Sequence, residues 1–310
     1  MNKLKESRLL SFIVIILVYA FSVALGIVIY NALEFNFCIN LLIADSISTI
    51  TVFAFSLIFD NSSVYDPYWS VAPIVVVIAY AAKFGLNTNT LFILIAVILW
   101  GTRLTLNWAY TFKNLNHEDW RYRMYKERFP KIYPIINFFG IHYFPTIVVY
   151  LCMLPLAFVF NKENEFGPLI IIGFVISISA FILQMISDLE MHSFRKKQTH
   201  TLINVGLWKY SRHPNYLGEI LMWWGIYFMM LAVMPNYFYL FIGALINTSM
   251  FLFISIPMAE KRQSSKEGFD LYKKNTHMLL PIPKKQVKEL DWFQLFSLII
   301  FSNYLICAKI

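Results

Sequence analysis

Long apolar stretches recur along most of this 310-residue chain, separated by short polar segments. A helix needs roughly 20 apolar residues to cross the hydrocarbon core of a bilayer, and only helices or closed barrels can satisfy their backbone groups there. Hydrophobic residues make up 58% of the sequence and charged residues only 14%, whereas soluble chains carry about a quarter. The sequence therefore predicts an all-α, integral membrane bundle of eight to nine transmembrane helices.

The first apolar stretch follows Lys3, Lys5 and Arg8, as a signal peptide would. Its apolar part is about 22 residues long and ends without a small-residue cleavage site, so we expect it to be retained. A ninth segment, Trp292–Ala308, either crosses the membrane or lies at its surface. The eight other predicted spans are Leu9–Tyr30, Leu41–Phe59, Val71–Phe84, Thr90–Phe112, Ile141–Phe160, Pro168–Leu189, Leu217–Met234 and Tyr237–Pro257.

We expect one membrane domain over residues 1–310. Its N-terminal helices occupy 1–60, a middle part at 61–189 forms the substrate side, a cofactor-binding part covers 190–290, and a terminal apolar helix covers 291–310. The three cysteines lie far apart, without the spacing of a zinc site or a disulfide framework, so no metal is expected.

Basic residues fall almost entirely in alternate connections. With the N-terminus in the cytosol, the inward segments hold every lysine and arginine except Lys83, Arg103, Lys162 and Lys309. This bias predicts a cytosolic N-terminus, in a bacterial inner membrane or the endoplasmic reticulum. It also explains the net charge of +8 without a nucleic-acid partner, and no obligate protein partner is indicated. The same segments are rich in Asp, Glu, Asn and His, which predicts a site open to the cytosol.

The segment KYSRHPNYLGEI at 209–220 places a dense polar cluster at the mouth of a predicted span. Pro214 suits the first turn of a helix, and Gly218 lets a neighbouring helix approach closely. A cap and interfacial anchors account for one or two of these polar residues but not for all of them, and a helix N-terminus favours an anionic ligand. The candidate ligand-binding residues are Arg212, His213, Asn215, Tyr216 and Glu219.

Arg103 lies deep inside a predicted span, where a charge costs roughly 3 kcal/mol unless it meets a partner or water. Trp100 and Asn107 share its helix face. We expect Arg103 to pair with a ligand phosphate or with an acid near the cytosolic end of another span, the candidates being Asp66, Asp188 and Glu219.

Two further segments have simpler interpretations. The span that ends at Asp188 continues as a helix through Arg195, and residues 117–129 form an amphipathic helix suited to the membrane surface. No glycine-rich nucleotide loop or nucleophile elbow occurs, so the bundle's own side chains must hold any nucleotide.

The stretches GLWKYSRHPNYLGEILMWWGIY, SDLEMHSFRK and MAEKRQSSKEGFDLYKKNTHMLLP resemble the C-terminal half of the steroid 5-alpha-reductase family, in its microbial-type branch. SVYDPYWS and LWGTRLTLNW resemble the same branch, so the likeness covers most of residues 60–283. Sterol C14 and C24 reductases share the NYLGE element. Members of this family are multi-span helical reductases that bind NADPH in a cytosol-facing cavity.

The resemblance implies NADPH as cofactor and assigns roles to the residues that match the family's motifs. Asp188 and Arg195 match a cofactor-contacting acid and base, and Asn215, Tyr216 and Glu219 match the element at the nicotinamide end. Tyr210 falls on a preceding aromatic position, and Arg262 and Tyr272 on positions near the adenosine phosphates. The full predicted cofactor site is Arg103, Asn107, Asp188, Arg195, Tyr210, Arg212, His213, Asn215, Tyr216, Glu219, Arg262 and Tyr272.

One departure from the family concerns the proton donor. The steroid reductases use a Tyr assisted by a Glu, but Trp100 stands where that Tyr would be once Arg103 is aligned. No Glu stands at the matching N-terminal position either. We therefore expect Tyr65 or Tyr68, with Asp66, to act as the catalytic phenol and carboxylate. The lipophilic substrate, drawn from the bilayer, is left open as steroid-, sterol- or isoprenoid-like.

Two other functions are compatible with these patterns. Isoprenylcysteine and phospholipid methyltransferases, which use S-adenosylmethionine, also carry RHPxYxG followed by an acid and tyrosine pattern, here Glu260, Phe269 and Tyr272. A non-catalytic sterol or lipid binder on the same scaffold is the third class. Asn215 and Gly218–Glu219 favour the reductase, so we expect NADPH-dependent reduction of a carbon–carbon double bond.

Overall fold

The computed structural model describes residues 2–162, 164–197 and 201–283; the predicted terminal segment Trp292–Ala308 lies outside them. Within the described residues the regular structure is entirely helical. Eight helical segments are long and apolar enough to cross a membrane, and each overlaps one of the eight predicted spans. The chain is thus an all-α, multi-pass integral membrane protein, as expected.

The transmembrane part is built from α2 (Arg8–Ala32), α3 (Phe37–Ile58), η1 (Ser62–Tyr65) with α4 (Tyr68–Phe84), α5 (Thr88–Thr111), α7 (Tyr133–Ile135) with η2 (Ile136–Tyr143) and α8 (Phe144–Asn161), α9 (Ile170–Lys197), α10 (Pro214–Val233), and η4 (Pro235–Phe241) with α11 (Ile242–Met250), η5 (Phe251–Ser255) and α12 (Ile256–Gln263). The remaining helices are α1 (Asn2–Glu6), α6 (Trp120–Arg128), η3 (Gly206–Lys209) and α13 (Phe269–Asn275). Two of the spans contain π-helical turns, η2 and η5, which hydropathy does not predict.

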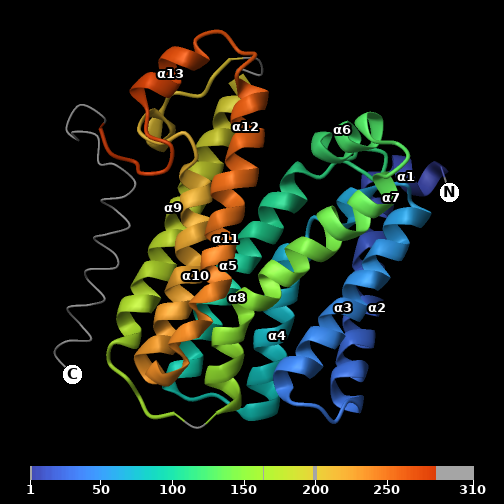
Figure 1. Ribbon diagram of the computed structural model, residues 1–310. Coiled ribbons are helices and arrows are strands. Elements are labelled where there is room, and N and C mark those ends of the chain that lie inside the picture. Colours follow the sequence, from blue (N-terminus) through green and yellow to red (C-terminus); the bar gives the residue numbers. More distant parts are fainter. Residues whose placement is uncertain (1, 163, 198–200, 284–310) are drawn as a thin grey trace.

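Figure 1 shows α9 to α12 gathered on one side of the bundle and α2 and α3 on the other, with α4, α5 and α8 between them. The N-terminus, α6 and α13 lie at the same end, which we term the basic end. Polar connections at this end carry most of the chain's lysines and arginines.

Among the described residues, α9 and α10 form the most extensive contact between two helices, and small residues line it. A Cβ added to Gly218 would lie 2.3 Å from Cγ of Gln184, and one added to Gly225 would lie 2.1 Å from Oγ of Ser177. Lipid supplies no hydrophobic driving force for helix association, so membrane helices are held together by close packing. Small residues permit that packing because they let the two backbones approach each other. The expected close approach at Gly218 is therefore confirmed, and it brings Gln184 against the start of α10.

Candidate functional site

A row of polar side chains runs between α5 and α9, from the middle of the bundle to the basic end. Residues four apart on α9 share a helix face, as do residues three and seven apart on α5. The polar side chains of α5 therefore lie opposite those of α9 in successive levels, each of which we call a rung. We term this row the polar ladder; its members are Trp100, Arg103 and Asn107 on α5 and Gln184, Asp188 and His192 on α9.

The middle rung is an ion pair between Arg103 and Asp188. Nη1 of Arg103 donates to Oδ2 of Asp188 at 2.5 Å, and the two side chains are only 10% and 15% exposed. Of the three acids that the sequence offered to Arg103, the structure selects Asp188. Pairing offsets the cost of placing either charge at membrane depth.

The outer rung joins Asn107 to His192. Nε2 of His192 lies 2.7 Å from Oδ1 of Asn107, and its ring packs on Tyr110, whose centroid is 4.6 Å away. Lys196, one turn further along α9, lies over the face of Tyr110. The ladder therefore reaches the basic end.

The inner rung centres on the buried carboxylate of Glu219, at the start of α10. Its Oε1 accepts hydrogen bonds from the indole N–H groups of Trp69 and Trp223, each at 3.2 Å. Its Oε2 accepts from the indole of Trp100 at 2.9 Å and from the amide of Gln184 at 2.8 Å. Trp100, which stands where the family's Tyr was expected, thus holds Glu219, and four helices converge on this one side chain.

Two buried polar atoms of the ladder have no protein partner. They are Nε of Arg103, a donor, and Oε1 of Gln184, an acceptor. Buried polar atoms in native proteins are nearly always paired, so this unpartnered donor and acceptor on neighbouring rungs leave hydrogen-bonding capacity unused.

Arg212, in the RHPN segment, binds residues of α12 and of the segment that follows it. Nε of Arg212 donates to Oε1 of Glu260 at 2.7 Å, and its Nη1 donates to the carbonyls of Thr276 and Lys273. Lys273 pairs with the second oxygen of Glu260 at 2.8 Å. Arg212 and Glu260 are therefore committed to holding the segment after α12 against the start of α10.

Tyr272 and Tyr210 also help to hold the C-terminal segment against the residues that precede α10. The hydroxyl of Tyr272 donates to the carbonyl of Trp208 at 2.6 Å, and burial raises the pKa of Tyr272 above its ordinary value. Tyr272 also lines a cleft of about 480 Å³ between α13 and the 201–209 segment. The carbonyl of Tyr210 accepts from the backbone N–H of His277, while its side chain is exposed.

Asn215, Tyr216 and His213 lie at the N-terminus of α10, where the expected start at Pro214 is confirmed. The rings of His213 and Tyr216 stack at 5.2 Å, and Nε2 of His213 lies 3.5 Å from Oε1 of Glu260. The backbone carbonyl of Asn215 accepts from the side-chain amide of Gln184 at 3.5 Å, which joins the start of α10 to α9.

A basic cluster lies where α9 and α12 reach the basic end. Burial, followed by the charges of Arg195 and Arg262, lowers the pKa of Lys266, because the three cations share one region. Arg262 also lies over the ring of Trp120 on α6, 4.5 Å from its centroid. Repelling cations are suited to a multiply charged anion such as a phosphate.

Two of the three predicted catalytic residues, Tyr65 and Tyr68, lie in a separate polar group, the phenol cluster, between α3, α4 and α8, and Asp66 lies beside it. The structure gives each of them a different partner from the one expected. Tyr68 donates to Oδ1 of Asp45 at 2.5 Å, Tyr65 shares a 2.8 Å hydrogen bond with Thr146, and Asp66 accepts from Tyr122 at 2.8 Å. The cluster consists of Asp45, Thr49, Tyr65, Tyr68, His142 and Thr146.

His142 of the phenol cluster is fully buried in the π-helical turn η2, and its Nε2 has no partner. Its Nδ1 lies 2.9 Å from the carbonyl of Asn137. A carbonyl only accepts, so Nδ1 carries the proton and Nε2 of the neutral ring is an acceptor. Oδ2 of Asp45 is also unpartnered.

Sequence reasoning missed several of these residues, although a signal existed for some. Gln184 and His192 lie one helical turn to either side of Asp188, on the face that Asp188 already marked. Asp45 and His142 are isolated ionisable residues inside apolar spans, which is itself a mark of function in membranes.

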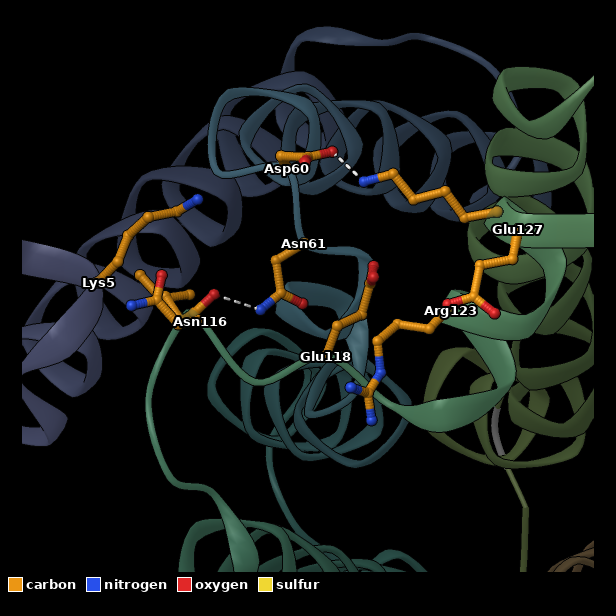
Figure 2. A pocket seen from close by; sticks show the side chains of 9 residues that line it. Lys5, Asp60, Asn61, Asn116, Glu118, Arg123 and Glu127 are labelled. Atoms are coloured by element: carbon orange, nitrogen blue, oxygen red, sulfur yellow. Dashed lines mark hydrogen bonds and ion pairs between the residues drawn. The ribbon is translucent and has the colours of Figure 1, made fainter. Parts of the chain in front are cut away.

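A further cleft, of about 350 Å³, opens at the basic end between the N-terminal segment, the turn after α3 and α6 (Figure 2). Lys126 pairs with Asp60 across it. Positive and negative side chains alternate around its wall, and none of the predicted site residues lines it.

Comparison with known proteins gives a family but no activity. A curated relative, "Uncharacterized protein C594.04c" of Schizosaccharomyces pombe, is 27% identical over 198 residues, which cover 54% of this chain. The chain spans 57% of that relative's length. No solved structure matches significantly. The family model described as "Protein of unknown function (DUF1295)" matches residues 52–276, which include the ladder, the basic cluster and all the predicted site residues. The chain therefore belongs to the DUF1295 family.

Proposed function

We propose that this protein is an NADPH-dependent membrane reductase that saturates a carbon–carbon double bond in a lipophilic substrate. The observation that carries the proposal is the polar ladder, with an unpartnered buried donor and acceptor at its inner end and three cations near its outer end. The resemblance to the steroid 5-alpha-reductase family supports the same assignment.

The residues present fit NADPH by charge and by hydrogen-bonding capacity. Arg195, Arg262 and Lys266 would hold its phosphates, including the 2′-phosphate that distinguishes it from NADH. Arg103 Nε and Gln184 Oε1 offer the donor and acceptor that a carboxamide requires. The positive-inside bias would place this end in the cytosol, where the cofactor is.

When bound, NADPH would supply a hydride to one carbon of the double bond. The other carbon needs a proton, and the charge that develops on a conjugated carbonyl needs a donor nearby. We assign that donor to the hydroxyl of Tyr68, held by Asp45 rather than by Asp66. Tyr68 and Trp69 are consecutive residues at the start of α4, so this one helix contributes to both the phenol cluster and the inner rung.

The residues shared with membrane methyltransferases do not favour that rival function. Arg212 and Glu260 are bound to each other, and the hydroxyl of Tyr272 is bound to a backbone carbonyl. Their role in fastening the C-terminal segment explains the pattern without S-adenosylmethionine.

Thermal unfolding of the detergent-purified protein tests the proposal, with NADPH, NADH and S-adenosylmethionine added in parallel. A ligand at a hundredfold excess over its dissociation constant adds about 2.7 kcal/mol to stability. We expect NADPH to raise the unfolding temperature most. Stabilisation by S-adenosylmethionine alone would overturn the reductase assignment, and no response to any of the three would favour a lipid-binding role.

A further inference from the structure

The inner end of the polar ladder carries an unbalanced charge. Arg103 is positive and Asp188 negative, and the two neutralise each other at 2.5 Å. Glu219 lies beside them with relative exposure of 5%. Its four hydrogen-bond partners are three indoles and one amide, all neutral, and no lysine or arginine donates to it in the part of the chain that the structure describes.

The hydrogen bonds around Glu219 match the acceptor pattern of a carboxylate. A carboxylate accepts at about four lone-pair sites, and here each oxygen accepts two N–H donors. This set of donors fits a negative charge, and the two oxygens have no capacity left for a ligand.

A buried charge without a counter-charge is costly, and the cost falls when a cation comes near. We propose that Glu219 acts through space, as a fixed anion that favours the oxidised, positively charged nicotinamide ring over the reduced, neutral ring. This inference rests on the proposed NADPH site. It makes Glu219 a positioning residue that increases the reducing power of the bound cofactor, not one that contacts it.

The dissociation constants of NADP⁺ and NADPH, measured on the same protein by calorimetry, test this charge preference without any substrate. Glu219→Gln removes the charge and keeps the shape, so it should weaken NADP⁺ binding about tenfold more than NADPH binding, as loss of one buried charge interaction implies. Trp223→Phe is the matched control, because it removes one hydrogen bond to Glu219 and leaves the charge. It should change both constants by the same factor.

Asp188→Asn provides a second charge change should Glu219→Gln fold poorly. It removes the other negative charge while leaving an oxygen for Arg103, so it should shift the ratio of the two constants in the same direction. A ratio that stays constant in Glu219→Gln would overturn the role of Glu219 while leaving the NADPH site intact. Failure of the native protein to bind either form would instead overturn the proposed function.

Discussion

The polar ladder and the phenol cluster are both buried polar groups within the same bundle, yet they differ in charge. The ladder contains an ion pair, binds the carboxylate of Glu219 at its inner rung and leads to three cations. The phenol cluster contains hydroxyls, one imidazole and one carboxylate, and no lysine or arginine donates to it among the described residues. Charged groups suit a nucleotide, and neutral donors suit the few oxygens of a lipid. We propose from this contrast that the two halves of the bundle divide cofactor and substrate between them.

The largest expected effect is a loss of activity without a loss of NADPH affinity, which would separate the phenol cluster from the ladder. Tyr68→Phe removes the proposed proton donor, so NADPH oxidation in the presence of a total lipid extract should fall by at least about 100-fold. NADPH affinity should stay unchanged, because the ladder is intact. Tyr122→Phe, which removes the phenol bound to Asp66, is the matched control and should retain most of the activity. Full activity in Tyr68→Phe would remove the phenol cluster from the mechanism.

The second effect concerns the stability of the ladder. Arg103→Met leaves Asp188 buried without its partner, which should lower the free energy of unfolding by about 3–5 kcal/mol. The double variant Arg103→Met/Asp188→Leu should recover most of that loss, since no charge is then left unpaired. Thermal unfolding in detergent measures both, and a double variant no more stable than the single one would contradict the pairing.

The third effect tests the basic cluster. Arg262→Gln should weaken NADPH binding about tenfold, the scale of one hydrogen bond to a charged group, and should leave NADH binding nearly unchanged. Arg128→Gln, at the far end of α6, removes an exposed arginine as a control for net charge. Equal losses for both cofactors would place the 2′-phosphate elsewhere.

The smallest effect is a pH dependence at the start of α10. Burial lowers the pKa of His213 below its ordinary value, although Glu260 opposes the shift. The unfolded chain therefore takes up a proton before the folded one does as the pH falls, so stability decreases below about pH 6.5. His213→Gln should flatten the unfolding temperature between about pH 7 and pH 5. An unchanged slope would mean that His213 is not the group responsible.

Much of the fold followed from the sequence because hydropathy alone locates spans in a membrane. All eight described spans were predicted, and so were the continuation of α9 through Arg195, a helix within residues 117–129 and the start of α10 at Pro214. The π-helical turns were not, because a backbone that shifts by one residue leaves no mark on hydropathy.

The candidate site was only partly predictable, for a different reason. The sequence marked Arg103 as needing a partner but could not choose among three acids, since the choice depends on how helices far apart in the chain pack. Nearness in sequence suggested Asp66 for the phenols, yet the short helix η1 turns Tyr65 and Asp66 towards different neighbours. The carboxylate that binds Tyr68 lies on the preceding span.

The division between the two regions depends on NADPH binding along the ladder, and tryptophan emission measures that most directly. Trp100 and Trp223 lie in ring contact at the inner rung, with centroids 5.1 Å apart, and both bind Glu219. We predict that NADPH quenches the emission of the purified protein saturably, with sensitised emission from the bound cofactor, and that Trp100→Phe reduces the transfer. Saturable quenching by S-adenosylmethionine, with none by NADPH, would contradict the account.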